Sequence, residues 1–148
     1  MNDDMNNKNE LVVKANCLVE ASYRLSLSQQ RLILLSITES RRTGTGLTVD
    51  SILVIRAADY AETFDVPLNE AYVQLKDAGH SLFMRYVVLY DWNPKTKRND
   101  KINLHWLSYV KYKEGEGEVE IQFSQQMVPY ITWCLTLQGS NPISQNTL

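Results

Sequence analysis

The sequence predicts an α+β fold of the winged-helix class, because the spacing of its apolar residues changes once along the chain. Between residues 57 and 83 the apolar residues recur at helical spacing, interrupted by one turn that contains proline, which is typical of a helix-turn-helix. From residue 85 the period becomes two, as in strands with one buried face. The expected architecture is a helix-turn-helix with a three-stranded antiparallel β wing and additional N- and C-terminal helices.

The N-terminal part predicts a polar leader followed by two helices. Residues 1–10 are rich in Asn and Asp and are expected to be disordered, whereas residues 11–21 have the apolar spacing of a helix. Residues 26–29 read S-x-x-Q, a capping box in front of a second helix at about 28–39. Because Leu34 extends the apolar surface nearly all round, we expect this helix to be the most buried one.

The helix-turn-helix follows a loop and a short strand. Residues 41–50 combine glycines with charge and predict a loop, and the β-branched run at 51–56 predicts a strand. A compact helix at 57–64 is followed by Pro67, which suits the first turn of a new helix at about 68–83. The apolar side chains of that helix, four, three and four residues apart, are Ala71, Leu75, Ala78 and Leu82.

Three strands and a closing helix are expected in the remaining chain. The strands cover residues 85–91, 102–112 and 118–123. A basic loop at 92–101 joins the first two, and the glycines at 114–117 supply the positive φ of a tight hairpin between the last two. Ser124 is expected to cap a helix that runs to about residue 135. In the last strand, residues expected in the core alternate with residues expected to face solvent, and the core residues are Val119, Ile121 and Phe123.

Composition restricts the class of protein. A chain of 148 residues fits one domain, and no apolar run approaches the roughly 20 residues that span a membrane. The polar, acidic N-terminus is unlike a signal peptide, and two cysteines give neither a disulfide framework nor a metal-binding spacing. We therefore expect a cytoplasmic protein without a metal or other cofactor.

The residues that carry catalysis in enzymes are not found in a recognisable arrangement. His80 and His105 lie on different predicted elements, with no nucleophile or carboxylate at a suitable spacing. The GTG of residues 44–46 lacks the G-K-[ST] ending of a phosphate loop. We expect no enzymatic activity and no catalytic residue.

Four stretches resemble the plasmid replication initiator family, whose members bind repeated sites in a plasmid origin. They are EASYRLSLSQQRLILLSI, AADYAETFDVPLNEAYVQLKDAGHSLFMR, the strand from Trp106 to Tyr112 with its Gly hairpin, and GEVEIQFSQQMVPYI. Together they span roughly residues 11–131. The resemblance implies a winged helix that binds origin repeats as a monomer, represses its own gene as a dimer, and recruits the host initiator protein and the replicative helicase.

The resemblance ends after Ile131, where the family continues into a second winged-helix domain. This chain instead reads TWCLTLQGSNPISQNTL. Two accounts stay open, a domain boundary or a premature stop or frameshift. The expected organisation is one winged-helix domain at 11–137, a disordered tail at 138–148, and no second domain. We accordingly expect this chain alone not to initiate replication.

Two regions are candidates for DNA contact, although the net charge of −2 supplies no general attraction to nucleic acid. On the third helix Gln74 and Lys76 have side chains that read base edges, but the acidic neighbours Glu70 and Asp77 make a solvated face an equally good interpretation. At the end of that helix Arg85 is a candidate for phosphate contact, and Arg41 and Arg42 are weaker ones. The basic loop is favoured over them, through Lys95, Lys97, Arg98 and Lys101.

Self-association is expected on the long strand after the basic loop. The family forms dimers through its first domain, and an unpaired strand of this length would be prone to pair with another copy. The alternating residues of its predicted exposed face are Leu104, Trp106, Ser108, Val110 and Tyr112. Two alternative functions remain, a dimerisation module that no longer contacts DNA and a generic winged-helix transcription regulator.

Overall fold

A computed structural model describes residues 20–44 and 46–132 of the chain, and its element order matches the predicted winged helix. The predicted leader and tail, and most of the predicted helix at 11–21, lie outside these residues. The helices are α2 (Leu27–Arg42), α3 (Ala57–Phe64) and α4 (Leu68–Met84). The strands are β1 (Leu53–Arg56), β2 (Tyr86–Asn93), β3 (Arg98–His105), β4 (Leu107–Lys113) and β5 (Glu118–Phe123). The α+β winged-helix class is confirmed.

Helix α2 begins with the predicted capping box. The Ser26 hydroxyl accepts from the Gln29 amide at 3.3 Å, and the Gln29 side chain accepts from the Ser26 amide at 2.9 Å. The helix buries Leu32 and Leu35, yet Leu34 remains 51% exposed. Leu34 therefore does not extend the buried surface around α2 as expected, although α2 has as many buried residues as the longer α4. Its buried stripe includes three polar side chains, Gln29, Ser36 and Ser40.

Helices α3 and α4 form the predicted helix-turn-helix. The turn between them is set by Asp65, which has a left-handed backbone with φ of 54°, followed by Pro67 in front of α4. All four residues predicted for the buried face of α4 are fully buried: Ala71, Leu75, Ala78 and Leu82. Gly79 is buried as well, and a Cβ at this position would lie 3.3 Å from the Val110 side chain of β4. The absence of a side chain thus lets α4 approach β4 closely.

The strands divide into two separate sheets, so the three strands expected at 85–91, 102–112 and 118–123 do not form one wing. One is an antiparallel sheet in the order β1-β5-β4, in which β5 pairs on both sides. Its core face is the predicted one, with Val119, Ile121 and Phe123 buried. A short 3-10 turn, η1 (Glu114–Glu116), and Gly117 with φ of 64° connect β4 to β5, as the glycines predict.

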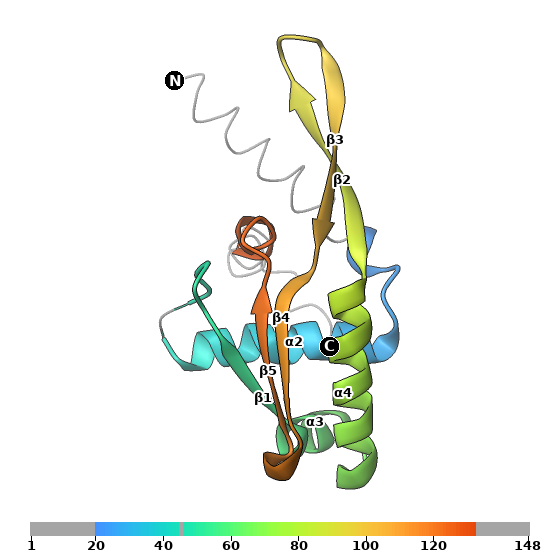
Figure 1. Ribbon diagram of the computed structural model, residues 1–148, viewed down its shortest axis with the longest axis vertical. Helices are drawn as coiled ribbons and strands as arrows, with labels where there is room; N and C mark the ends of the chain where they lie inside the picture. The colour runs from blue at the N-terminus through green and yellow to red at the C-terminus, as the bar shows by residue number, and fades with distance from the viewer. Residues whose placement is uncertain (1–19, 45, 133–148) are drawn as a thin grey trace, which may run out of the picture.

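The second sheet is a two-stranded hairpin of β2 and β3, which extends beyond the rest of the described fold (Figure 1). The basic segment was expected to be a ten-residue loop at 92–101, but β2 runs to Asn93 and β3 begins at Arg98. Pairing continues along both strands to the register Asn93↔Arg98, so only residues 94–97 form the turn. Arg98 and Lys101 consequently lie on a strand, with their side chains on opposite faces.

The single strand predicted at 102–112 is two strands. The chain changes sheets at Trp106, whose amide donates to the Arg85 carbonyl at 3.5 Å. Trp106 and Leu107 are both buried, whereas strict alternation would bury only one of them. Burial of both residues in the core therefore fixes the position of the break between β3 and β4.

Ser124 does not cap the closing helix through its side chain as expected. Its hydroxyl donates to the His105 carbonyl at 2.6 Å, which ties the end of β5 to the junction between β3 and β4. Its backbone carbonyl accepts from the amides of Met127 and Val128 at the helix start. The described part of this helix, residues 128–132, covers one end of the core with Val128, Tyr130 and Ile131.

Candidate nucleic-acid interface

The base-reading candidates of α4 are engaged inside the domain. The Tyr60 hydroxyl donates to Gln74 Oε1 at 2.7 Å, and Arg31 reaches the same oxygen at 3.4 Å. Lys76 forms an ion pair with Glu114 of η1, which raises the lysine pKa and lowers the glutamate pKa through their hydrogen bond. Both side chains thus hold α4 against its neighbours and are not free to read base edges.

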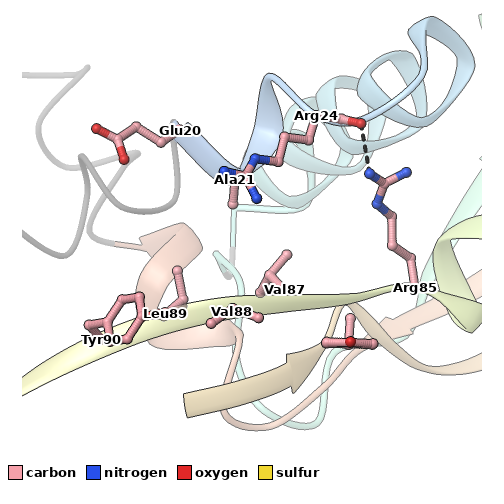
Figure 2. A pocket seen from close by; sticks show the side chains of 9 residues that line it. Glu20, Ala21, Arg24, Arg85, Val87, Val88, Leu89 and Tyr90 are labelled. Atoms are coloured by element: carbon pink, nitrogen blue, oxygen red, sulfur yellow. Dashed lines mark hydrogen bonds between the residues drawn. The ribbon is translucent and has the colours of Figure 1, made fainter. Parts of the chain in front are cut away.

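Arg85 is also committed to an internal partner. Its Nη2 donates to the Arg24 carbonyl at 2.8 Å, drawn as the dashed line in Figure 2. The two arginines border a cavity of about 420 Å³ that runs along β2 from Arg85 to Tyr90, with Glu20 and Ala21 on its other side (Figure 2). The position of Arg85 makes it a link between the end of α4 and the segment before α2.

The outer end of the β2–β3 hairpin carries cations that form no ion pair with the part of the chain that the structure describes. The Asn93 side chain accepts from the Lys95 amide at 3.0 Å and donates to Asp100 at 3.0 Å, while the Asn93 carbonyl accepts from the Lys97 amide at 2.8 Å. Lys97 has a left-handed backbone with φ of 56°. Within residues 20–44 and 46–132, no ion pair involves the side chains of Lys95, Lys97, Arg98 or Lys101. All four are exposed.

The predicted self-association face is only partly on the surface. Leu104 and Trp106 are 8% and 1% exposed, so the expectation that they form an exposed surface is wrong. Because the chain turns into a second sheet at Trp106, the two ends of the predicted strand do not share one face. Ser108 is exposed at a β-bulge, Val110 packs on α4, and Tyr112 is 36% exposed.

Sequence reasoning missed an exposed apolar row on β2. Tyr86, Val88, Tyr90 and Trp92 alternate along the strand and all lie on the face turned away from the core. The signal was present in the sequence, because a run that ends in YVVLYDW places aromatic residues on one face at period two. It was hidden by the assumption that the strand stops at residue 91 and that a loop follows.

Two further features, a metal site and a membrane-spanning helix, are absent from the described residues. No cluster of His, Cys, Asp and Glu among them could hold a metal ion. None of the helices in this part of the chain combines the length and the apolar character that crossing a membrane requires.

Comparison with known proteins places this geometry in a family. Residues 11–134 match the family model described as initiator replication protein, WH1. The WH1 domain of MSBI1.176, a replication protein isolated from a multiple sclerosis patient, is 36% identical, with a TM-score of 0.72 over 85% of this chain and 95% of that domain. The Pi initiator protein, solved in complex with iteron DNA, has the same fold at 21% identity and a TM-score of 0.59, over 86% of this chain and 49% of that one.

A curated relative from Escherichia coli, an uncharacterized 27.6 kDa protein, is 28% identical over 137 residues. The match covers 87% of this chain and 56% of that protein, so the chain spans about half the length of this relative. The family model covers most of the chain, including every described element from α2 to β5. The chain therefore belongs to the initiator replication protein family, in which it corresponds to the WH1 domain.

Proposed function

We propose that this chain binds duplex DNA as the first winged-helix domain of a plasmid replication initiator, and that the turn of the β2–β3 hairpin makes the contact. The observation that carries the proposal is the set of four exposed cations at the outer end of the hairpin, two in the turn and two on β3, none of which forms an ion pair with a described carboxylate. Cations of this kind contact phosphates and position a protein without reading sequence. The engaged state of Gln74 and Lys76 also favours the hairpin over α4.

The DNA that we propose is the repeated sequence of a plasmid origin. Membership of the initiator family supports this choice, and so does the common fold with the Pi initiator, which was crystallised with iteron DNA. In the whole initiator we further propose autorepression as a dimer, recruitment of the host initiator protein and the replicative helicase, and a cytoplasmic location. The role is one of binding rather than catalysis.

For the homodimer we propose pairing at β4. This strand is at one edge of the three-stranded sheet, and Ser108 and Tyr112 keep part of its surface exposed. A lysine on an edge strand opposes pairing between copies. Ser108→Lys should therefore shift the sedimentation of a dimer towards that of a monomer, whereas Ser28→Lys on α2 should not. Equal sedimentation of both variants with the parent protein would exclude β4 as the interface.

The salt dependence of duplex binding tests the DNA proposal. Affinity for duplex DNA falls as salt rises, so a plot of the logarithm of the association constant against the logarithm of salt concentration has a negative slope. Replacing Lys97 and Arg98 with Gln should make this slope less steep by about 1.8, since each phosphate contact contributes roughly 0.9. The matched control neutralises Arg24 and Lys111, two exposed cations outside the hairpin, and changes the net charge equally. A short duplex of arbitrary sequence suffices as probe, because phosphate contacts are independent of sequence.

Equal slopes for both double variants would remove the hairpin turn as the DNA contact. If the parent chain bound no duplex at all, the dimerisation module would be the better account of this domain. Binding restricted to a palindromic operator, without affinity for origin repeats, would instead favour a transcription regulator.

A further inference from the structure

One face of the β2–β3 hairpin carries a continuous row of exposed apolar side chains. Tyr86 is 56% exposed, Val88 37%, Tyr90 54% and Trp92 59%. The intervening residues Val87 and Leu89 are buried on the opposite face and attach the hairpin to the core. The row is thus not needed to hold the hairpin in place. Large apolar side chains gathered on the surface of a soluble domain generally mark a binding site.

The cross-strand neighbours of this row are polar or basic. In the register of β2 and β3, Tyr86 lies opposite His105, Val88 opposite Asn103, Tyr90 opposite Lys101, and Trp92 opposite Asn99. Directly opposed residues of an antiparallel pair project from the same face of the sheet. The ring of His105 already contacts that of Tyr86 edge to face, with centroids 6.4 Å apart. The face therefore combines aromatic rings with amide donors and acceptors and one cation.

The carboxylates of the hairpin are confined to its other face. Asp91 and Asp100 are its two acidic residues, and they lie opposite each other in the register. Since side chains alternate along a strand, both project away from the aromatic row. The aromatic face thus has no negative charge, and it ends at the turn that carries Lys95 and Lys97.

We infer that this aromatic face binds single-stranded DNA, with bases stacked on Tyr86, Tyr90 and Trp92 and the phosphates held by Lys101 and the cations of the turn. Every base has a π face, so aromatic rings bind single strands with little dependence on sequence. Asn103 lies opposite Val88, between Tyr86 and Tyr90, and Asn99 lies opposite Trp92. Both side chains can hydrogen-bond to the Watson–Crick edges of bases, which are free only when the duplex is open.

The spacing of the rings suits an extended strand. Alternate residues of a β-strand are about 6.7 Å apart, roughly twice the 3.4 Å rise per nucleotide of stacked DNA. Bases on Tyr90 and Trp92 must therefore be separated from each other, as they are when each stacks on its own ring. Tyr86 to Trp92 spans about 20 Å, enough for a few extended nucleotides.

A second copy of the chain fits this face less well than nucleic acid does. Two copies that packed their aromatic faces together would bring Lys101 and the cations of the turn into a shared interface, and no carboxylate on the face could neutralise them. A polyanion with stackable rings satisfies both features at once. The charge of the face thus favours DNA.

The inference rests on the proposed function and extends it from duplex to separated strand. A duplex contacts the turn cations through its phosphates, whereas an opened strand also has free bases for the aromatic face. Duplex binding and single-strand binding use the same cations, but only single-strand binding uses the aromatic rings. Variants of the rings therefore separate the failure of this inference from the failure of duplex binding.

The test compares Trp92→Ala, Trp92→Leu and Trp92→Phe in the full chain. The probe is a fluorescent oligothymidylate of about 12 nucleotides, which cannot form a duplex and lies within the usual range of site sizes. Anisotropy titration should show an affinity loss of about 5-fold to 150-fold for Trp92→Ala, which is the loss that removal of one stacked base produces. Trp92→Leu should lose nearly as much, because leucine is apolar but cannot stack, whereas Trp92→Phe should retain most of the affinity.

Two controls fix the interpretation. Tyr23→Ala removes an exposed aromatic ring outside the hairpin and should leave oligothymidylate affinity unchanged. Trp92→Ala should leave affinity for the short duplex within about twofold, since phosphate contacts do not involve the ring. Equal affinity of Trp92→Ala and the parent chain for oligothymidylate, with duplex binding intact, would overturn the inference while leaving the proposed function in place. A parent chain that sediments as a dimer and becomes monomeric on Trp92→Ala, without loss of oligothymidylate binding, would reassign the face to self-association.

Discussion

At the scale of single residues, the contacts of Gln74 decide how α4 is used. Its side-chain oxygen accepts from Tyr60 of α3 and from Arg31 of α2, so one side chain joins three helices. Arg31 in turn lies over the ring of Phe64, 4.9 Å from its centroid. A residue that could read adenine in a groove is here a structural connector.

The capping box of α2 gives the first prediction. Ser26→Ala removes the oxygen that accepts from the Gln29 amide, and we expect a loss of about 0.5–2 kcal/mol in the free energy of unfolding. Ser26→Asp keeps an acceptor at the same position and should stay close to the parent protein. Urea denaturation followed by circular dichroism measures both changes. A loss of equal size in the two variants would mean that the hydrogen bond is not what Ser26 contributes.

A second prediction concerns Lys113, which forms ion pairs with Glu116 at 2.9 Å and Glu118 at 3.3 Å. The hydrogen bond from Lys113 lowers the pKa of Glu116 below its ordinary value of 4.5. Because this pKa is lower in the folded state, the stabilisation is complete above about pH 4.5 and disappears as pH falls through the lowered value. Lys113→Met should therefore lower the urea midpoint at neutral pH.

On acidification the difference between Lys113→Met and the parent protein should shrink, since protonated Glu116 no longer gains from the lysine. Urea midpoints at about pH 7, 5 and 3 measure this trend. Lys95→Met is the control, because Lys95 forms no ion pair with any described residue and its effect should not change with pH. A constant deficit for Lys113→Met across this range would contradict the assignment.

At the scale of elements, the contact between α4 and β4 depends on Gly79. Alanine is the better helix former by about 0.5–1 kcal/mol, but its Cβ would lie 3.3 Å from Val110. We therefore expect Gly79→Ala to stabilise the domain more in a Val110→Ala background than in the parent protein. Urea unfolding of the four proteins in this cycle gives the coupling. Identical gains in stability in both backgrounds would show that β4 shifts to accommodate the added Cβ without loss of stability.

The elements that local sequence determines were predicted closely. The helix at 57–64 agrees with α3 at both ends, because the Pro-containing turn limits it, and the S-x-x-Q pattern marks the start of α2. The hairpin turn before β5 follows from its glycines. In contrast, the break at Trp106 has no local signal, since the residues on either side keep strand-like character. It exists because Trp106 and Leu107 enter the core together.

At the scale of the whole molecule, the candidate interface depends on the length of the hairpin. The basic residues were predicted, but as a loop, and a loop gives no reason to expect ordered faces. Pairing out to Asn93↔Arg98 places Lys101 among aromatic rings and turns Asp91 and Asp100 away from them. Polar residues such as Asn99 have low strand propensity, so the sequence favours a loop there. The cross-strand partner that offsets this preference is visible only in the fold.

The same geometry predicts how stability is distributed. Strand β5 pairs on both sides and is covered by the core, whereas the outer half of the hairpin has one partner strand and exposed side chains on both faces. Amide protons between Tyr90 and Lys101 should therefore exchange at least about 10³-fold faster than those of Val119 and Ile121. The reason is that local opening costs far less than the roughly 5–15 kcal/mol of global unfolding. Native-state hydrogen exchange measured by NMR resolves both groups.

Exchange in the presence of oligothymidylate extends this prediction to the ligand. A strand stacked on Tyr90 and Trp92 binds only the closed hairpin, so it should slow exchange at the outer hairpin in proportion to its occupancy and leave β5 unchanged. A short duplex held by the turn cations should slow the amides of residues 95–97 and have less effect towards Tyr86. Equal protection of both regions by either ligand would mean that binding stabilises the domain globally, and would contradict a site confined to the hairpin.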